Sequence, residues 1–145
     1  MPTSSIQFEH KWREFARPDG LIIYRPVLPV MVRGQDDLLT RFFLVDSGAD
    51  LSMAPRELCQ QLGLRWQDGA RTTLRGISSH QSSVVQGRIH EVDILIPDAS
   101  MLIRLPMVFA RASAPFVLGR EGFFAVFNIT FEKVNRRTVF QLVEN

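Results

Sequence analysis

Apolar and polar residues alternate along much of the chain, a pattern that is typical of half-buried β-strands. The alternation is clearest at residues 92–96 and 127–131. Other short apolar or alternating runs lie at residues 6–12, 21–32, 40–45, 101–109, 116–118 and 139–142. The eleven Phe residues, together with many Val and Ile, also favour strands. The sequence therefore predicts a mainly β protein, in which residues 40–45 form a buried strand.

Glycine and proline mark where these strands should end. Pro26 and Pro29 interrupt the apolar run 21–32, and proline cannot donate to a strand ladder, so this strand should lie at an edge or break in two. Residues 71–87 predict a long hairpin with a polar, glycine-containing tip. Further turns are expected at residues 17–20, 34–37, 68–69, 97–100 and 133–137.

Only two short helices are expected. In the first, Pro55 occupies the first helical position, where its missing N–H costs nothing. Leu58 and Leu62, with Cys59, form its apolar face, and Gly63 is the expected stop. The second helix should run from Arg120 to about residue 126.

Length and composition indicate an ordinary globular protein. The chain has 145 residues, of which 46% are hydrophobic and 22% charged. We expect an N-terminal strand or extension over residues 1–20 and a single domain over residues 21–145. The formal net charge is +2 and the arginines are scattered, so a nucleic-acid partner is not expected.

Several kinds of site and location are also disfavoured. One cysteine, Cys59, cannot form an internal disulfide. No apolar run approaches the roughly 18 residues of a membrane span, and the N-terminus does not look like a signal peptide, so we expect a cytoplasmic protein without a membrane partner. His10, His80 and His90 lack metal-ligand spacing, and we expect no metal or other cofactor.

The most informative stretch places a carboxylate, Asp46, directly after four apolar residues at 42–45. Ser47 follows with a hydroxyl, and Gly48 allows the backbone to approach the carboxylate closely. Read alone, this triplet is an Asx turn that closes a strand. Ser47 is not a convincing serine nucleophile, because the Gly-x-Ser-x-Gly elbow is absent.

The chain resembles the retropepsin-like aspartic proteases of the retroviral-protease-like kind, in particular their bacterial branch. Residues 46–49 are similar to the catalytic Asp-Ser/Thr-Gly-Ala loop of that family, and residues 52–64 to the helix that follows it. Residues 116–120 resemble the second signature, apolar residues followed by Gly119 and Arg120. The resemblance covers about residues 21–142. It implies a closed retropepsin-like β-barrel, the acid protease fold, with a short helix after the catalytic loop and a short C-terminal helix.

The resemblance also implies an aspartic-type endopeptidase that works as a homodimer. Such enzymes activate a water between two carboxylates that share one proton. Asp46 is the only Asp of this chain in that context, so the second carboxylate would come from a second copy across a twofold axis. Proteolysis would then act on an extended peptide or protein substrate, with a mildly acidic optimum.

Roles for other residues follow from their match to the family. Ser47, Gly48, Gly119 and Arg120 would support the active site, with Asp50 and Arg120 forming a partly buried ion pair. Substrate would be bound by Ala49, Asp50 and the flap residues Gly76, Ile77 and Ser78. Two alternatives remain open, a catalytically silent peptide-binding or protein-binding module and a structural module that uses the fold only to dimerise.

Overall fold

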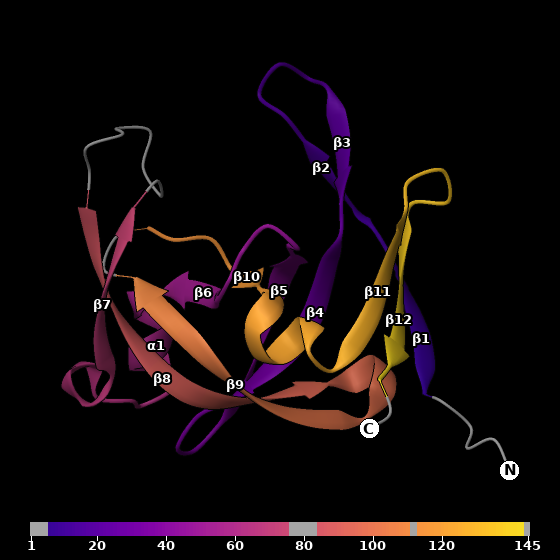
Figure 1. Cartoon of the computed structure of the whole chain (residues 1–145). Coiled ribbons are helices and arrows are strands. Elements are labelled where there is room, and N and C mark those ends of the chain that lie inside the picture. Colours follow the sequence, from indigo (N-terminus) through magenta and orange to yellow (C-terminus); the bar gives the residue numbers. More distant parts are fainter. Residues whose placement is uncertain (1–5, 76–83, 111–112, 144–145) are drawn as a thin grey trace, which may run out of the picture.

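The computed structural model describes residues 6–75, 84–110 and 113–143, and over these residues the chain is mainly β (Figure 1). The strands are β1 (Gln7–Lys11), β2 (Arg13–Ala16), β3 (Ile22–Arg25), β4 (Val27–Arg33), β5 (Leu38–Val45), β6 (Ser52–Pro55), β7 (Ala70–Arg75), β8 (Val84–Ile96), β9 (Met101–Ala110), β10 (Val117–Leu118), β11 (Phe127–Glu132) and β12 (Arg137–Leu142). The helical segments are α1 (Arg56–Gln61), η1 (Trp66–Asp68), η2 (Pro97–Ala99) and η3 (Arg120–Phe124). The predicted mainly β class is confirmed.

The largest sheet closes on itself. Its strands follow the order β4-β5-β10-β6-β9-β8-β7, and β4 also pairs with β8. Six of the seven strands therefore form a closed ring of pairings, and β7 is attached outside it as the second arm of the β7–β8 hairpin. β10 pairs in parallel with β5 and antiparallel with β6, which makes it the bridge between the strand before Asp46 and the strand after it.

The two ends of the described chain meet in a separate three-stranded sheet with the order β1-β12-β11. Phe8 of β1 stacks on Phe140 of β12 with ring centroids 4.6 Å apart. Phe140 also meets Phe127 and Phe123 edge-on, at 5.9 Å and 6.1 Å. These rings join the N-terminal strand to the C-terminal hairpin, at the side of the molecule opposite the β7–β8 hairpin (Figure 1).

The apolar run 21–32 does break in two, as predicted. Pro26 separates β3 from β4, and Pro29 lies within β4 opposite Phe42 of β5. β2 and β3 pair with each other as a two-stranded sheet that projects from the rest of the molecule (Figure 1). The strand expected at residues 6–12 is confirmed as β1 (Gln7–Lys11), whereas β2 (Arg13–Ala16) was not predicted.

The first helix agrees with its prediction apart from its start. Pro55 precedes α1 in an extended conformation (φ −71°, ψ 154°) and caps it rather than opening it. Leu58 and Cys59 are buried, and Gly63 ends the helix with a positive φ of 75°. η3 is shorter than predicted, because Glu121 and Gly122 leave helical geometry within it and Gly122 has a φ of +85°.

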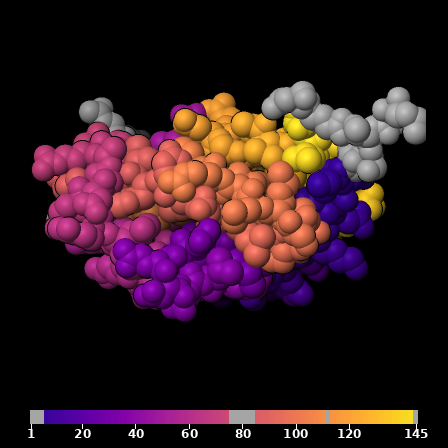
Figure 2. Space-filling view, turned by 90° about the horizontal axis from the view of Figure 1, so that it is seen from below, coloured from indigo at the N-terminus to yellow at the C-terminus, as the bar shows by residue number. Residues whose placement is uncertain are grey.

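The core lies inside the closed ring and continues under the three-stranded sheet. Its largest fully buried side chains are Phe43, Phe109, Phe123, Phe127, Phe140, Leu28, Leu58, Leu62, Ile94, Ile96, Leu105 and Met107. Seen from below, β8 and β9 occupy the middle of the molecular face (Figure 2). The prediction that residues 40–45 form a buried strand was right for the strand and only partly right for its burial. Phe43 and Val45 of β5 are buried, but Phe42 faces away from the core and is 48% exposed.

Candidate active site

Asp46 lies where β5 leaves the closed ring. The strand is held on both sides up to this point, because the Val45 N–H donates to the Pro26 carbonyl oxygen (2.9 Å) and the Asp46 N–H donates to the Leu118 carbonyl oxygen (3.0 Å). The chain then turns, and the Ala49 N–H donates back to the Asp46 carbonyl oxygen at 3.3 Å. Backbone pairing with two neighbouring segments therefore fixes the position from which the carboxylate projects.

The carboxylate itself is oriented by Gly48. The Gly48 N–H donates to Oδ1 of Asp46 at 2.8 Å, and the Asp46 residue is half-buried in the single chain. A Cβ atom on Gly48 would lie 3.2 Å from the same oxygen, which is a tight contact. This hydrogen bond is the one that defines an Asx turn. It is therefore expected whether residues 46–48 only close a strand or form a catalytic loop. The two interpretations differ in whether the other expected site residues lie around this turn.

β10 and the residues after it are bound to this loop, as the two motifs predict. The Arg120 N–H donates to the Ala49 carbonyl oxygen (2.8 Å), and the Glu121 N–H donates to the Asp50 carbonyl oxygen (2.9 Å). Gly119 passes so close to the loop that a Cβ atom there would lie 2.5 Å from the Leu51 carbonyl oxygen. An Asx turn that only ended a strand would not need a second segment packed against it at this distance.

Arg120 and Asp50 form the expected ion pair, between Nη2 and Oδ1. The expectation that the pair is partly buried was wrong for the single chain, since the side chains are 57% and 82% exposed. The reason is local, because backbone bonds align residues 49–50 with residues 120–121 along the surface of the loop and both side chains point away from the core.

The other predicted site residues divide into two groups. Ser47 and Gly48 are exposed and Ala49 is half-buried, all within the loop that follows Asp46. Gly76, Ile77 and Ser78 lie outside the described residues, although the flanking strands β7 and β8 form the predicted hairpin. The proposed contacts of all six residues with substrate or with a second loop stay predictions.

Ser52 is a supporting residue that the sequence did not reveal. It is fully buried at the start of β6, and its Oγ accepts a hydrogen bond from the Gly119 N–H at 3.0 Å. β6 also pairs in parallel with β9, with Ser52 opposite Met107. A hydroxyl within an otherwise apolar segment was the available signal, but its partner is 67 residues away in the chain.

Within residues 6–75, 84–110 and 113–143, no cluster of three or more His, Cys, Asp or Glu side chains could hold a metal ion. No helix in the same part of the chain is long and apolar enough to cross a membrane. Burial raises the pKa of the Cys59 thiol, which disfavours the thiolate that a cysteine nucleophile needs.

The fold is similar to that of solved structures of other proteins. No family model matches the chain, and no curated protein matches it. A solved structure of a retropepsin-like aspartic protease from Rickettsia conorii is similar over 98% of this chain and 97% of its own, with a TM-score of 0.61 and 15% identity. EIAV protease, complexed with the inhibitor HBY-793, aligns over 66% of this chain and 82% of its own, with a TM-score of 0.45 and 26% identity. The closed ring of strands, the β10 segment bound to the Asp46 loop and the match to the Rickettsia structure together show that the chain has the retropepsin-like fold.

Proposed function

We propose that the protein is an aspartic endopeptidase whose reaction centre consists of two Asp46 carboxylates, one from each subunit of a homodimer. The observation that carries the proposal is the Asp46 loop, in which Gly48 orients the carboxylate and the segment after β10 fixes the loop. The fold match to a retropepsin-like aspartic protease supports the same reaction class.

The dimer follows from the chemistry of amide hydrolysis. An ionised carboxylate takes a proton from water while the water oxygen bonds to the scissile carbonyl carbon, and a second, protonated carboxylate donates to the carbonyl oxygen. The tetrahedral intermediate collapses when the C–N bond breaks. The carboxyl group that took the proton from water gives it to the amine nitrogen, and the other carboxylate takes back a proton from a hydroxyl of the intermediate. The other carboxylate of this loop, Asp50, is already paired with Arg120. A twofold axis that passes beside Asp46 would supply a second Asp46 as the partner.

The remaining residues of the loop receive roles in this proposal. Ser47 and Gly48 are exposed next to the carboxylate, where they are free to contact the second loop. The paired Asp50 and Arg120 would present charged groups at the end of the cleft, beside an extended peptide. Such a peptide would be recognised through its backbone, with alternate side chains in pockets, and the β7–β8 hairpin would close over it. No cofactor takes part, and we propose a cytoplasmic location.

The test is cleavage of a mixed peptide library at several pH values by the wild-type chain and by Asp46→Asn. We expect cleavage that is strongest at mildly acidic pH and lost in Asp46→Asn, since the dyad needs one proton and two carboxyl groups. Asp19→Asn is the matched control, because Asp19 also lies in a turn near a glycine but pairs with Arg17 at the surface. Equal cleavage by Asp46→Asn and wild type would refute the proposal. A wild-type chain that cleaves nothing but binds peptides would favour the silent binding module.

A further inference from the structure

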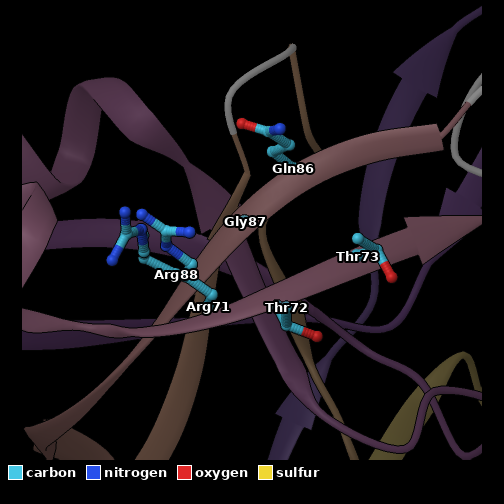
Figure 3. Close-up of a pocket in the computed structure, with 6 residues that line it drawn as sticks. All are labelled: Arg71, Thr72, Thr73, Gln86, Gly87 and Arg88. Carbon is cyan, nitrogen blue, oxygen red and sulfur yellow. The ribbon is translucent and has the colours of Figure 1, made fainter.

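The β7–β8 hairpin carries a polar hollow. Its volume is about 750 Å³, and it is lined by Arg71, Thr72, Thr73, Gln86, Gly87 and Arg88 (Figure 3). This is within the range of about 300–1,000 Å³ that is usual for ligand sites. All six residues belong to two neighbouring strands, so the hollow is built on one continuous backbone frame.

Two arginines directly face each other in this hairpin. In the register of the sheet, Arg71 of β7 is the cross-strand partner of Arg88 of β8. Figure 3 shows both guanidinium groups extending to the same side of the hairpin. Like charges at directly opposite positions destabilise a strand pair. An anion bound between the two guanidinium groups would offset this repulsion.

The chain itself does not supply that anion within the part that the structure describes. The ion pairs formed there join other residues, and neither Arg71 nor Arg88 belongs to one. Arg88 is instead held in place by the backbone, because its Nη1 donates to the carbonyl oxygens of Gly69 (3.0 Å) and Gln67 (3.3 Å). One guanidinium is thus pre-positioned, while the exposed Arg71 stands opposite it.

The other residues that line the hollow indicate which class of ligand would fit it. Thr73 and Gln86 form the neighbouring cross-strand pair on the same face, two residues along each strand from the arginines. That separation is about 7 Å, which is the spacing of alternate side chains in an extended peptide. None of the described lining residues is aromatic, so none of them offers a ring on which a nucleobase could stack. Guanidinium groups bind carboxylates through paired hydrogen bonds.

We propose that the hollow on the β7–β8 hairpin binds an acidic segment of an extended polypeptide, with Arg71 and Arg88 holding a Glu or Asp carboxylate and Thr73 and Gln86 contacting the residues beside it. The choice of a polypeptide rests on the peptidase function proposed above. The site would recruit protein substrates that carry acidic residues outside the segment that is cleaved.

Binding is measured by fluorescence anisotropy with a labelled hexaglutamate peptide, and a hexaglutamine peptide serves as the uncharged comparison. The protein is the full chain carrying Asp46→Asn, so that the result does not depend on cleavage. We expect hexaglutamate to bind and hexaglutamine not to bind. Arg71→Glu should weaken hexaglutamate binding by roughly tenfold, because one attraction is lost and one repulsion is added.

Arg71→Glu also gives a readout that a general loss of folding cannot mimic. The new carboxylate would face Arg88 and replace a repulsive cross-strand pair with an attractive one, so the thermal unfolding midpoint should rise while binding falls. Arg33→Glu is the control for net charge. Arg33 is an exposed arginine at the end of β4, and this change should alter binding by less than about twofold.

Three outcomes would overturn the proposal. The first is equal binding of hexaglutamate by Arg71→Glu and by its parent. The second is equal binding of hexaglutamine. The third is displacement of hexaglutamate by inorganic phosphate but not by sodium chloride of the same ionic strength, which would assign the hollow to a free oxyanion. Failure of the peptidase test would leave this binding result unchanged, so the two proposals fail separately.

Discussion

Gly119→Ala tests whether close packing of the segment after β10 against the Asp46 loop is required for the fold. Gly119 has φ −101° and ψ −174°, an extended conformation that alanine adopts without strain. Any effect of the substitution must therefore come from contacts of the added methyl group. Its nearest neighbours would be the Leu51 carbonyl oxygen at 2.5 Å, the Leu51 carbonyl carbon at 2.6 Å and the Ala49 carbonyl oxygen at 2.9 Å.

The loss of stability expected for Gly119→Ala follows from the atoms that the added methyl group would meet. All three neighbours are backbone atoms, so no change of rotamer relieves the overlap, and ordinary contact begins only at 3.4 Å. β10 would have to move away from the loop, which weakens the hydrogen bonds from Gly119 N–H to Ser52 Oγ and from Arg120 N–H to the Ala49 carbonyl oxygen. Each is worth about 1 kcal/mol, and overpacking adds about 1–3 kcal/mol. We expect the free energy of unfolding to fall by about 3 kcal/mol.

The assay is equilibrium unfolding in urea at a fixed protomer concentration, because association stabilises the folded state by mass action. Gly20→Ala is the matched control. Gly20 has a φ of +85° but no atom within 4 Å of an added Cβ, so this variant measures backbone strain without a clash and should cost about 1 kcal/mol. A Gly119→Ala protein within about 0.5 kcal/mol of wild type would refute the argument that β10 fixes the loop by contact.

Three further predictions follow from buried groups. Ser52→Ala should lower the free energy of unfolding by about 1–3 kcal/mol in a urea titration, because it leaves the Gly119 N–H without its acceptor. Phe123→Ala should cost about 3–5 kcal/mol in the same assay, since Phe123 is fully buried against Phe127. Burial raises the pKa of the Cys59 thiol above 9.0, so the folded state holds this proton more tightly than the unfolded state does. The stabilisation from this pKa difference is present below pH 9.0 and is lost as the pH rises through the pKa of the folded state. The free energy of unfolding should therefore decline between about pH 8 and pH 11, and Cys59→Ala should remove the part of this decline that comes from the thiol.

The strand pattern and the break points of the fold were accessible from the sequence because they depend on neighbouring residues. Pro26 divides the second apolar run wherever that run packs, since proline lacks an N–H. Gly63 ends α1 for an equally local reason, its positive φ of 75°. Hydrophobic alternation likewise marks β8, which buries Val92, Ile94 and Ile96, and β11, which buries Phe127.

What the sequence left out depends on segments far apart in the chain. β6 was missed because it is four residues long and exists through its pairing with β9, some 55 residues later. The burial of β5 was overestimated because its outer face is open, which a run of apolar residues does not reveal. The ion pair of Asp50 and Arg120 was expected from the resemblance, but its exposure depends on how two surface segments align.

The candidate site also combines features that the sequence reveals with features that depend on distant segments. The Asp46 triplet and the pair Gly119 and Arg120 could be identified as motifs, and the structure brings them together through backbone hydrogen bonds. Ser52 could not be identified, because a serine hydroxyl has no preferred partner until β10 is placed next to it. The arginines of the β7–β8 hairpin were inconspicuous, since only the strand register sets Arg71 opposite Arg88.

The sharing of one reaction centre by two subunits is tested most directly by mixing wild-type and Asp46→Asn chains. The two proteins are unfolded and refolded together in varied ratios at constant total concentration, and cleavage of one peptide is followed. If both carboxylates are needed, activity follows the square of the wild-type fraction, so an equal mixture retains about one quarter of the wild-type rate. Activity proportional to the wild-type fraction, with about one half retained in the equal mixture, would show that each chain acts alone and would contradict the account.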